Sequence, residues 1–159
     1  MRTNVMRLVM AKSAVVAIAT HPAYAKAAEP QAVRTNDMNL KLTVDDRVMT
    51  AALEDNATSR DFVALLPLTL TLKDYASTER ISDLPKRLSP QGAPAGSTPR
   101  VGDIAYYAPW GNRAIFRKDF KYSSGLIQIA HLNGDISALT VDGPVPVRIE
   151  LATSERAPR

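Results

Sequence analysis

Three short stretches of this sequence alternate apolar and polar residues with a strict period of two. They are residues 39–44 (NLKLTV), 68–73 (LTLTLK) and 145–151 (VPVRIEL). This period places every second side chain on one face of an extended chain, so each stretch predicts a β-strand with one buried face. Strands this short and this regular favour a small antiparallel sheet that closes on itself.

Five further strands are predicted along the chain, at residues 47–53, 103–108, 114–118, 126–132 and 135–141. The last two are joined by Asn133-Gly134, a pair that supplies the positive φ angles of a tight hairpin turn. The strands predict a fold that is mostly β.

One helix is expected, at residues 54–66, where apolar residues follow a helical spacing that Pro67 ends. Residues 74–88 are predicted to be irregular or a single helical turn, and the Pro- and Gly-rich residues 89–100 an exposed loop. Together these elements predict a small closed antiparallel β-barrel of about eight strands with one covering helix.

The first 25 residues have the three parts of a secretory signal peptide. Basic residues precede the apolar run 13–20, and Ala23-Tyr24-Ala25 offers a small-residue cleavage site. The run is too short for a membrane-spanning helix, which needs roughly 20 apolar residues. Export to the periplasm or the cell exterior is therefore expected. The alternative is an extension ahead of a true start at Met38.

The predicted domain organisation follows from this leader and from the strand pattern. It consists of a signal peptide (1–25), a flexible lead-in (26–37), a β-barrel domain (38–151) and a tail (152–159).

The basic character of the chain lies mainly in the leader. Residues 1–25 hold three basic residues and no acidic one, so their removal lowers the formal charge from +4 to +1. No run of Lys or Arg remains, and no nucleic-acid partner is expected. The absence of Cys excludes thiol catalysis and zinc–thiolate sites.

His131 is the only histidine beyond the leader, which restricts the chemistry further. In the predicted hairpin it shares an apolar face with Ile127 and Ile129, so a structural role in the core or at its rim is expected. A transition-metal site would need carboxylates at ligand spacing, and none are grouped in that way. Nucleophile elbows, phosphate loops and dinucleotide fingerprints are also missing. No catalytic residue, metal or cofactor is predicted.

The turn Pro109-Trp110-Gly111-Asn112 contains the only Trp of the chain. If this turn is a four-residue loop between two paired strands, Tyr107 pairs with Ala114. Phe116 then lies on the same face of the strand pair as these two residues, and Arg113 lies on the opposite face. Trp110 either packs back to cap the barrel end, which is the favoured role, or stands at a binding surface. The candidate ligand-binding residues are Trp110, Tyr107, Phe116 and Arg113.

Several motifs resemble the short bacterial cyclophilin-like domain family. They are Leu72-Lys73-Asp74-Tyr75, Glu79-Arg80-Ile81, Leu84-Pro85, the run GDIAYYAPWGN at 102–112, and Ala114-Ile115-Phe116. The resemblance covers residues 38–151 and implies the cyclophilin β-barrel in reduced form. The family is largely of unknown function, so the resemblance implies a fold more than a reaction. The Phe-Met-x-Gln run of prolyl isomerases is missing, and no isomerase residue is carried over.

These observations predict an exported cyclophilin-like protein that binds a peptide or a small molecule near Trp110 without catalysis. One alternative is a peptidyl-prolyl cis-trans isomerase with a degenerate active site, and another is a structural or partner-docking domain. An arginine beside an apolar groove on the barrel surface would favour the isomerase. A deep cavity at the barrel end would favour the binding protein.

The leader generates a first prediction, cleavage after Ala25 with Lys26 as the new N-terminus, because small residues occupy the positions that the signal peptidase reads. N-terminal sequencing of protein from the exported fraction measures this. An intact Met1, or a cytoplasmic protein that starts at Met38, would contradict it.

Overall fold

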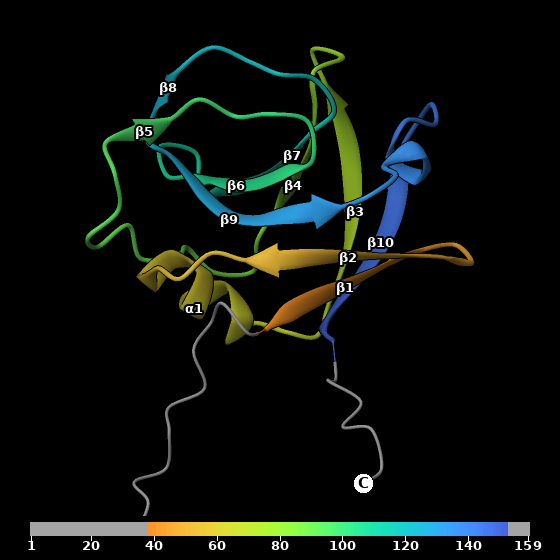
Figure 1. The fold of residues 1–159 in the computed structure, drawn as a ribbon, viewed down its shortest axis with the longest axis horizontal. Helices are drawn as coiled ribbons and strands as arrows, with labels where there is room; N and C mark the ends of the chain where they lie inside the picture. The colour runs from red at the N-terminus through yellow and green to blue at the C-terminus, as the bar shows by residue number, and fades with distance from the viewer. Residues whose placement is uncertain (1–37, 153–159) are drawn as a thin grey trace, which may run out of the picture. The chain divides into compact units, whose positions relative to one another are not determined.

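The computed structural model describes residues 38–152, and its eight longer strands close into one antiparallel barrel (Figure 1). The strand order around the barrel is β1-β10-β3-β4-β7-β6-β9-β2. The strands are β1 (Asn39–Val44), β2 (Arg47–Leu53), β3 (Leu68–Tyr75), β4 (Glu79–Asp83), β6 (Asp103–Tyr107), β7 (Asn112–Phe116), β9 (Leu126–Asn133) and β10 (Val145–Leu151). The predicted fold class is confirmed. The predicted signal peptide (1–25), the lead-in (26–37) and residues 153–159 of the predicted tail lie outside the described residues.

The barrel interior is built by the alternating strands that the sequence predicts. Leu40 and Leu42 of β1, Leu72 of β3, and Val147 and Ile149 of β10 are at most 1% exposed. Their polar neighbours point outward, as period two requires. Partner strands match in register, since Leu42 pairs with Ile149 and Val147 with Leu70.

One end of the barrel is covered by the helix α1 (Ala57–Val63), which is shorter than the predicted 54–66. Asn56 is its N-cap: the Asn56 Oδ1 accepts a hydrogen bond from the Ser59 backbone N–H at 2.8 Å. The Phe62 ring is fully buried and joins the core from this end. The predicted covering helix is therefore present and fills the space inside the strand ends.

The predicted hairpin strand 135–141 is wrong. A short 3-10 helix, η2 (Ser137–Leu139), occupies this position instead. The Asp135 Oδ1 accepts a hydrogen bond from the Ser137 backbone N–H at 2.9 Å, which turns the chain directly after Gly134. The turn brings Leu139, fully buried, into the core.

Strand β4 replaces the missing one, and it occupies part of the segment 74–88 that was predicted to be irregular. Its inward side chains are Arg80 and Ser82, both buried, while Ile81 points outward. The Arg80 guanidinium donates hydrogen bonds to the carbonyl oxygens of Leu139 (3.0 Å), Gly143 (2.5 Å) and Val141. Polar side chains at the inward positions reverse the usual alternation of apolar and polar residues, so the sequence pattern does not reveal this strand.

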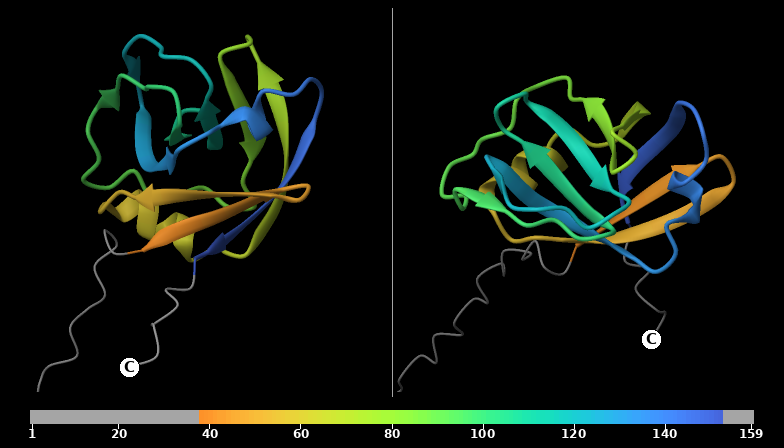
Figure 2. Two further views of the ribbon diagram at one scale, coloured as in Figure 1. Left: turned by 45° about the vertical axis from the view of Figure 1, so that its right-hand side comes forward. Right: turned by 90° about the horizontal axis from the view of Figure 1, so that it is seen from above.

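Two segments outside the barrel form a small second sheet, β5 (Gly96–Ser97) paired with β8 (Ser123–Ser124). Figures 1 and 2 show both segments on the side of the barrel that carries β6 and β7. A Cβ atom at Gly96 would lie only 2.3 Å from the Ser123 carbonyl oxygen, so the close approach requires glycine. The predicted exposed loop 89–100 is thus partly ordered by pairing. Among the described residues, no helix is long and apolar enough to cross a membrane.

The alternation in β3 generates a stability prediction. Leu72 is fully buried, so Leu72→Ala should lower the free energy of unfolding by about 2–5 kcal/mol. Thr71→Ala, on the exposed face, should cost less than about 1 kcal/mol. Denaturant melts of the two variants measure both values, and the opposite ranking would contradict the register.

Candidate functional site

The turn between β6 and β7 consists of residues 108–111, one position earlier than predicted. Gly111 takes the positive φ of +75°, and the Gly111 N–H donates a hydrogen bond to the Tyr107 carbonyl oxygen at 2.8 Å. Tyr107 therefore pairs with Asn112, not with Ala114, so the predicted pairing is wrong by two residues. A shift of two preserves the faces, because side chains alternate with period two.

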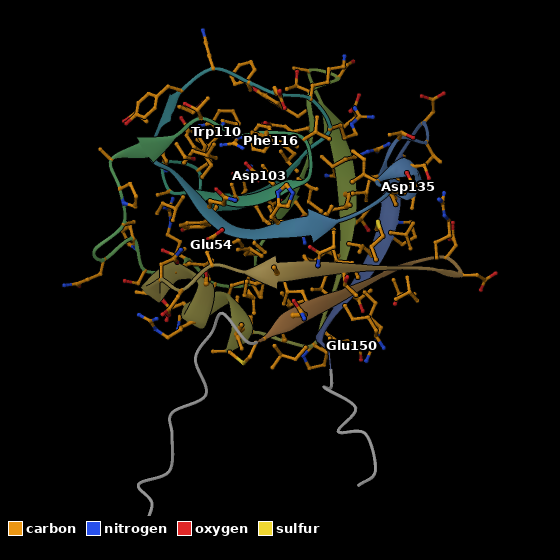
Figure 3. All side chains as sticks on the ribbon, viewed as in Figure 1. Glu54, Asp103, Trp110, Phe116, Asp135 and Glu150 are labelled. Atoms are coloured by element: carbon orange, nitrogen blue, oxygen red, sulfur yellow. The ribbon has the colours of Figure 1, made fainter. Side chains whose placement is uncertain are left out.

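A pocket of about 380 Å³ lies on the outer face of β7. The outward side chains of the strand form its floor, and the ends of β3 and β6 and the segment 120–126 form its walls. Its lining residues are Tyr75, Glu79, Tyr107, Trp110, Asn112, Ala114, Phe116, Phe120, Ser123, Ser124 and Leu126. Figure 3 shows Trp110 and Phe116 on the same side of the barrel. Six of these residues are aromatic or leucine, which gives a largely apolar cavity.

Trp110 stands between two tyrosine rings at the edge of this pocket. Its ring centroid lies 5.7 Å from that of Tyr75 and 5.3 Å from that of Tyr107, with interplanar angles of 81° and 80°. Edge-to-face contacts of this kind fix the orientation of a ring. The residue nevertheless stays 57% exposed and is not part of the core cluster that contains Phe62 and Leu139, so it does not cap the barrel end as predicted.

Two polar side chains lie among these apolar walls. Glu79, on β4, forms no hydrogen bond or ion pair through its carboxylate with any described residue, and burial raises the pKa of Glu79 above its ordinary 4.5. Asn112 is only 6% exposed, and its Oδ1 has no hydrogen-bond partner. The pocket thus holds a carboxylate and an amide oxygen that form no hydrogen bond with the described residues.

The structure brings three of the four predicted ligand-binding residues together and separates the fourth. Trp110, Tyr107 and Phe116 all line the pocket. Arg113 lies on the opposite face of β7, inside the barrel, and is fully buried. Its Nη2 donates to the Ser82 Oγ at 3.2 Å, while its Nε and Nη1 have no partner. Burial lowers the pKa of the Arg113 guanidinium to about 9.

His131 is placed differently from its prediction, because a β-bulge interrupts β9. Ile104 pairs with Ala130 but Ala105 pairs with Gln128, so Ile129 is the extra residue. The bulge turns His131 outward, where its side chain is 47% exposed. The His131 Nδ1 donates to the Asp103 carboxylate at 2.7 Å, and these two residues are also a cross-strand pair.

The Asp103 carboxylate is the centre of a second, polar cavity of about 300 Å³. Besides His131 it accepts hydrogen bonds from the Gln128 Nε2 at 3.0 Å and from the Arg100 backbone N–H at 2.8 Å. Glu54 and Thr98 complete the lining. These hydrogen bonds connect β6, which carries Asp103, with β9, which carries Gln128 and His131.

Among the described residues, no three His, Asp or Glu side chains come close enough together to hold a metal ion.

Arg113 generates a prediction about the buried guanidinium. Arg113→Met should leave the free energy of unfolding unchanged or raise it, because the variant removes a buried charge with only one hydrogen-bond partner. Arg80→Met is the matched control and should lower the free energy of unfolding by about 2 kcal/mol or more, because three carbonyl oxygens lose a charged donor. Denaturant melts compare the two. A large loss of stability in Arg113→Met would show that its charge is compensated.

Comparison with known proteins identifies the family. The model of the cyclophilin-like family matches residues 42–150. Among solved structures, the solution structure of the hypothetical protein AF2241 from Archaeoglobus fulgidus is similar, with a TM-score of 0.54 and 17% sequence identity over 76% of this chain and 98% of that chain. At this identity the likeness shows the fold alone. No curated protein matches the chain. With the family model covering most of the chain and an eight-stranded barrel beneath it, the protein belongs to the cyclophilin-like family.

Proposed function

We propose that this protein is a non-catalytic binding module that holds a peptide or a small molecule in the aromatic pocket on the outer face of β7. The observation that carries the proposal is Trp110, a large aromatic side chain that is 57% exposed and still held between two tyrosines. Exposed aromatic surface of this kind gains free energy when a partner covers it, and Trp and Tyr are the side chains that dominate binding sites.

The pocket is built in advance of binding. Its floor residues Ala114 and Phe116 are 2% exposed and pack with Ala105 and Leu126 in a second cluster outside the barrel. The β5–β8 pair ties the covering segment in place through backbone hydrogen bonds. Because little ordering remains to be done when a ligand arrives, a larger part of the contact energy appears as affinity.

The isomerase alternative receives no comparable support. An arginine beside the groove would favour it, but the residues that line the pocket include none, and Arg80 and Arg113 of the neighbouring strands are buried inside the barrel. The pocket is also not the deep cavity at the barrel end that was expected for a binding protein. It lies on the outer wall, and its depth comes from the segment 120–126 that folds over β7.

The place of action proposed is outside the cytoplasm. This part of the proposal rests on the leader pattern in residues 1–25 alone. It agrees with a chain that contains no Cys and so has no thiol to protect in an oxidising compartment.

Binding can be tested with the neutral, environment-sensitive naphthalene dye Prodan. Its emission should shift to the blue in a saturable way when it enters the apolar pocket, and Trp110→Ala should weaken binding at least tenfold, the scale of a lost interface anchor. The same variant should change the free energy of unfolding by less than about 1 kcal/mol, because the indole is more than half exposed.

Val48→Ala is the matched control, since Val48 is 61% exposed on β2 and lies outside the pocket lining. It should bind the dye like the parent protein. Equal binding by the parent and by Trp110→Ala, or no saturable binding at all, would overturn the proposal.

The proposed absence of catalysis can be tested separately. The protein should not accelerate cis-trans isomerisation of a Pro-containing peptide, which takes on the order of tens of seconds uncatalysed at 25 °C. The reason is that the residues that line the pocket include no arginine to polarise the peptide bond. A concentration-dependent acceleration that Trp110→Ala abolishes would replace the binding module with an enzyme.

A further inference from the structure

We infer that the aromatic pocket selects an organic cation, an alkylated ammonium group that lies against Trp110, Tyr75 and Tyr107 with Glu79 as its counter-charge. This inference rests on the proposed binding function and adds the chemical class of the ligand.

The first step is the arrangement of the rings. Trp110 makes edge-to-face contacts with Tyr75 on one side and with Tyr107 on the other, so three π-systems meet at the pocket edge in steeply different planes. The face of an aromatic ring carries negative potential and attracts a cation within about 6 Å. Several rings at steep angles form the kind of cage that surrounds an alkylated ammonium group, whose charge is spread over its carbons.

The second step is the carboxylate. Glu79 is partly buried in the same pocket, and burial without a compensating cation raises the pKa of Glu79. A carboxylate in apolar surroundings with no partner is unfavourable for stability, and a cationic ligand would supply the missing partner. The charge complement of this pocket is therefore positive.

The third step concerns the positive side chains around Glu79, which bind other groups or lie away from its carboxylate. Arg117 pairs with Asp74, and Arg80 binds three backbone carbonyls inside the barrel. The Lys121 Nζ lies 5.9 Å from the centre of the Phe120 ring at the outer margin. Lys73, Asp83 and Lys118 are exposed and outside the lining. Arg87, beside the turn that carries Trp110, donates a hydrogen bond to the Ala108 carbonyl oxygen at 3.0 Å. None of these groups neutralises Glu79.

The experiment compares choline with its neutral carbon isostere, 3,3-dimethylbutan-1-ol, by titration of the Trp110 emission. The two probes have the same shape, so the difference between them measures the charge. Choline should bind at least tenfold more tightly to the parent protein. Glu79→Gln should remove most of that difference and leave the isostere unchanged, while Trp110→Leu, followed by calorimetry, should weaken choline more than the isostere.

A second arm separates the two sources of such a group. N-acetyl-trimethyllysine N-methylamide presents the same cation on a peptide backbone, whereas choline presents it as a small molecule. Tighter binding of the peptide probe would assign the pocket to a modified protein segment, and tighter binding of choline would assign it to a small metabolite; either result supports the cation.

The pH profile gives a readout that a purely structural Glu79 would not produce. Protonation removes the charge, so choline affinity should fall as the pH is lowered through the raised pKa of Glu79, and the Glu79→Gln variant should show no such fall.

The stability of the protein without ligand gives another readout. Because the pKa of Glu79 is raised in the folded state, the folded protein loses stability as the pH rises through that pKa. Glu79→Gln should therefore have a higher Tm than the parent at neutral pH. Lys121→Gln is the matched control and should not weaken choline.

The outcomes are distinct from those of the proposed function. If Prodan and the isostere bind but choline binds no better than the isostere, or if Glu79→Gln binds choline as the parent does, the cation inference is wrong and the binding module stands. If none of the three probes binds, the binding module itself is wrong.

Discussion

Burial of β7 on both faces is the constraint on which the rest of this structure depends. All five residues of the strand, Asn112 to Phe116, are buried, although a strand in a barrel of this kind normally exposes its outer side chains to water. The inner face belongs to the barrel core through Ile115, and the outer face is covered by the segment that carries β8. The cover stops short of complete closure, and the remaining space is the aromatic pocket.

The two arginines of the interior show how such a barrel accommodates polar side chains. Arg80 satisfies its guanidinium with carbonyl groups of η2 and of the chain between η2 and β10, and so ties that segment to β4. Arg113 has no equivalent set of acceptors and has a single bond, to Ser82. Both residues occupy inward positions of adjacent strands. Arg80 stabilises the fold through its three hydrogen bonds, whereas Arg113 is buried with little compensation.

The sequence predicts the class of fold and much of the site, and its failures have physical causes. Period two identifies strands whose inward residues are apolar, as in β1, β3 and β10. The pattern misses β4, because Arg80 and Ser82 point inward there. It also predicts a strand at residues 135–141 that does not form, because the Asp135 side chain accepts a backbone hydrogen bond that turns the chain. Tyr107 and Phe116 can be grouped from face parity alone, and Trp110 joins them because it lies in the turn between their strands. Tyr75 and Glu79 belong to the same pocket but come from a distant hairpin, so only tertiary structure brings them in.

The separation of the pocket from the barrel interior has an evolutionary consequence. The pocket is lined by outward side chains of β3, β4, β6 and β7 and by the side chains of a covering segment, whereas the barrel core is made of the inward ones. Substitutions at positions such as Glu79 or Trp110 can therefore change the chemistry of the pocket while the side chains that fill the barrel core stay intact. The pocket and the core lie on opposite sides of the same strands, so the outer face can vary on a constant scaffold.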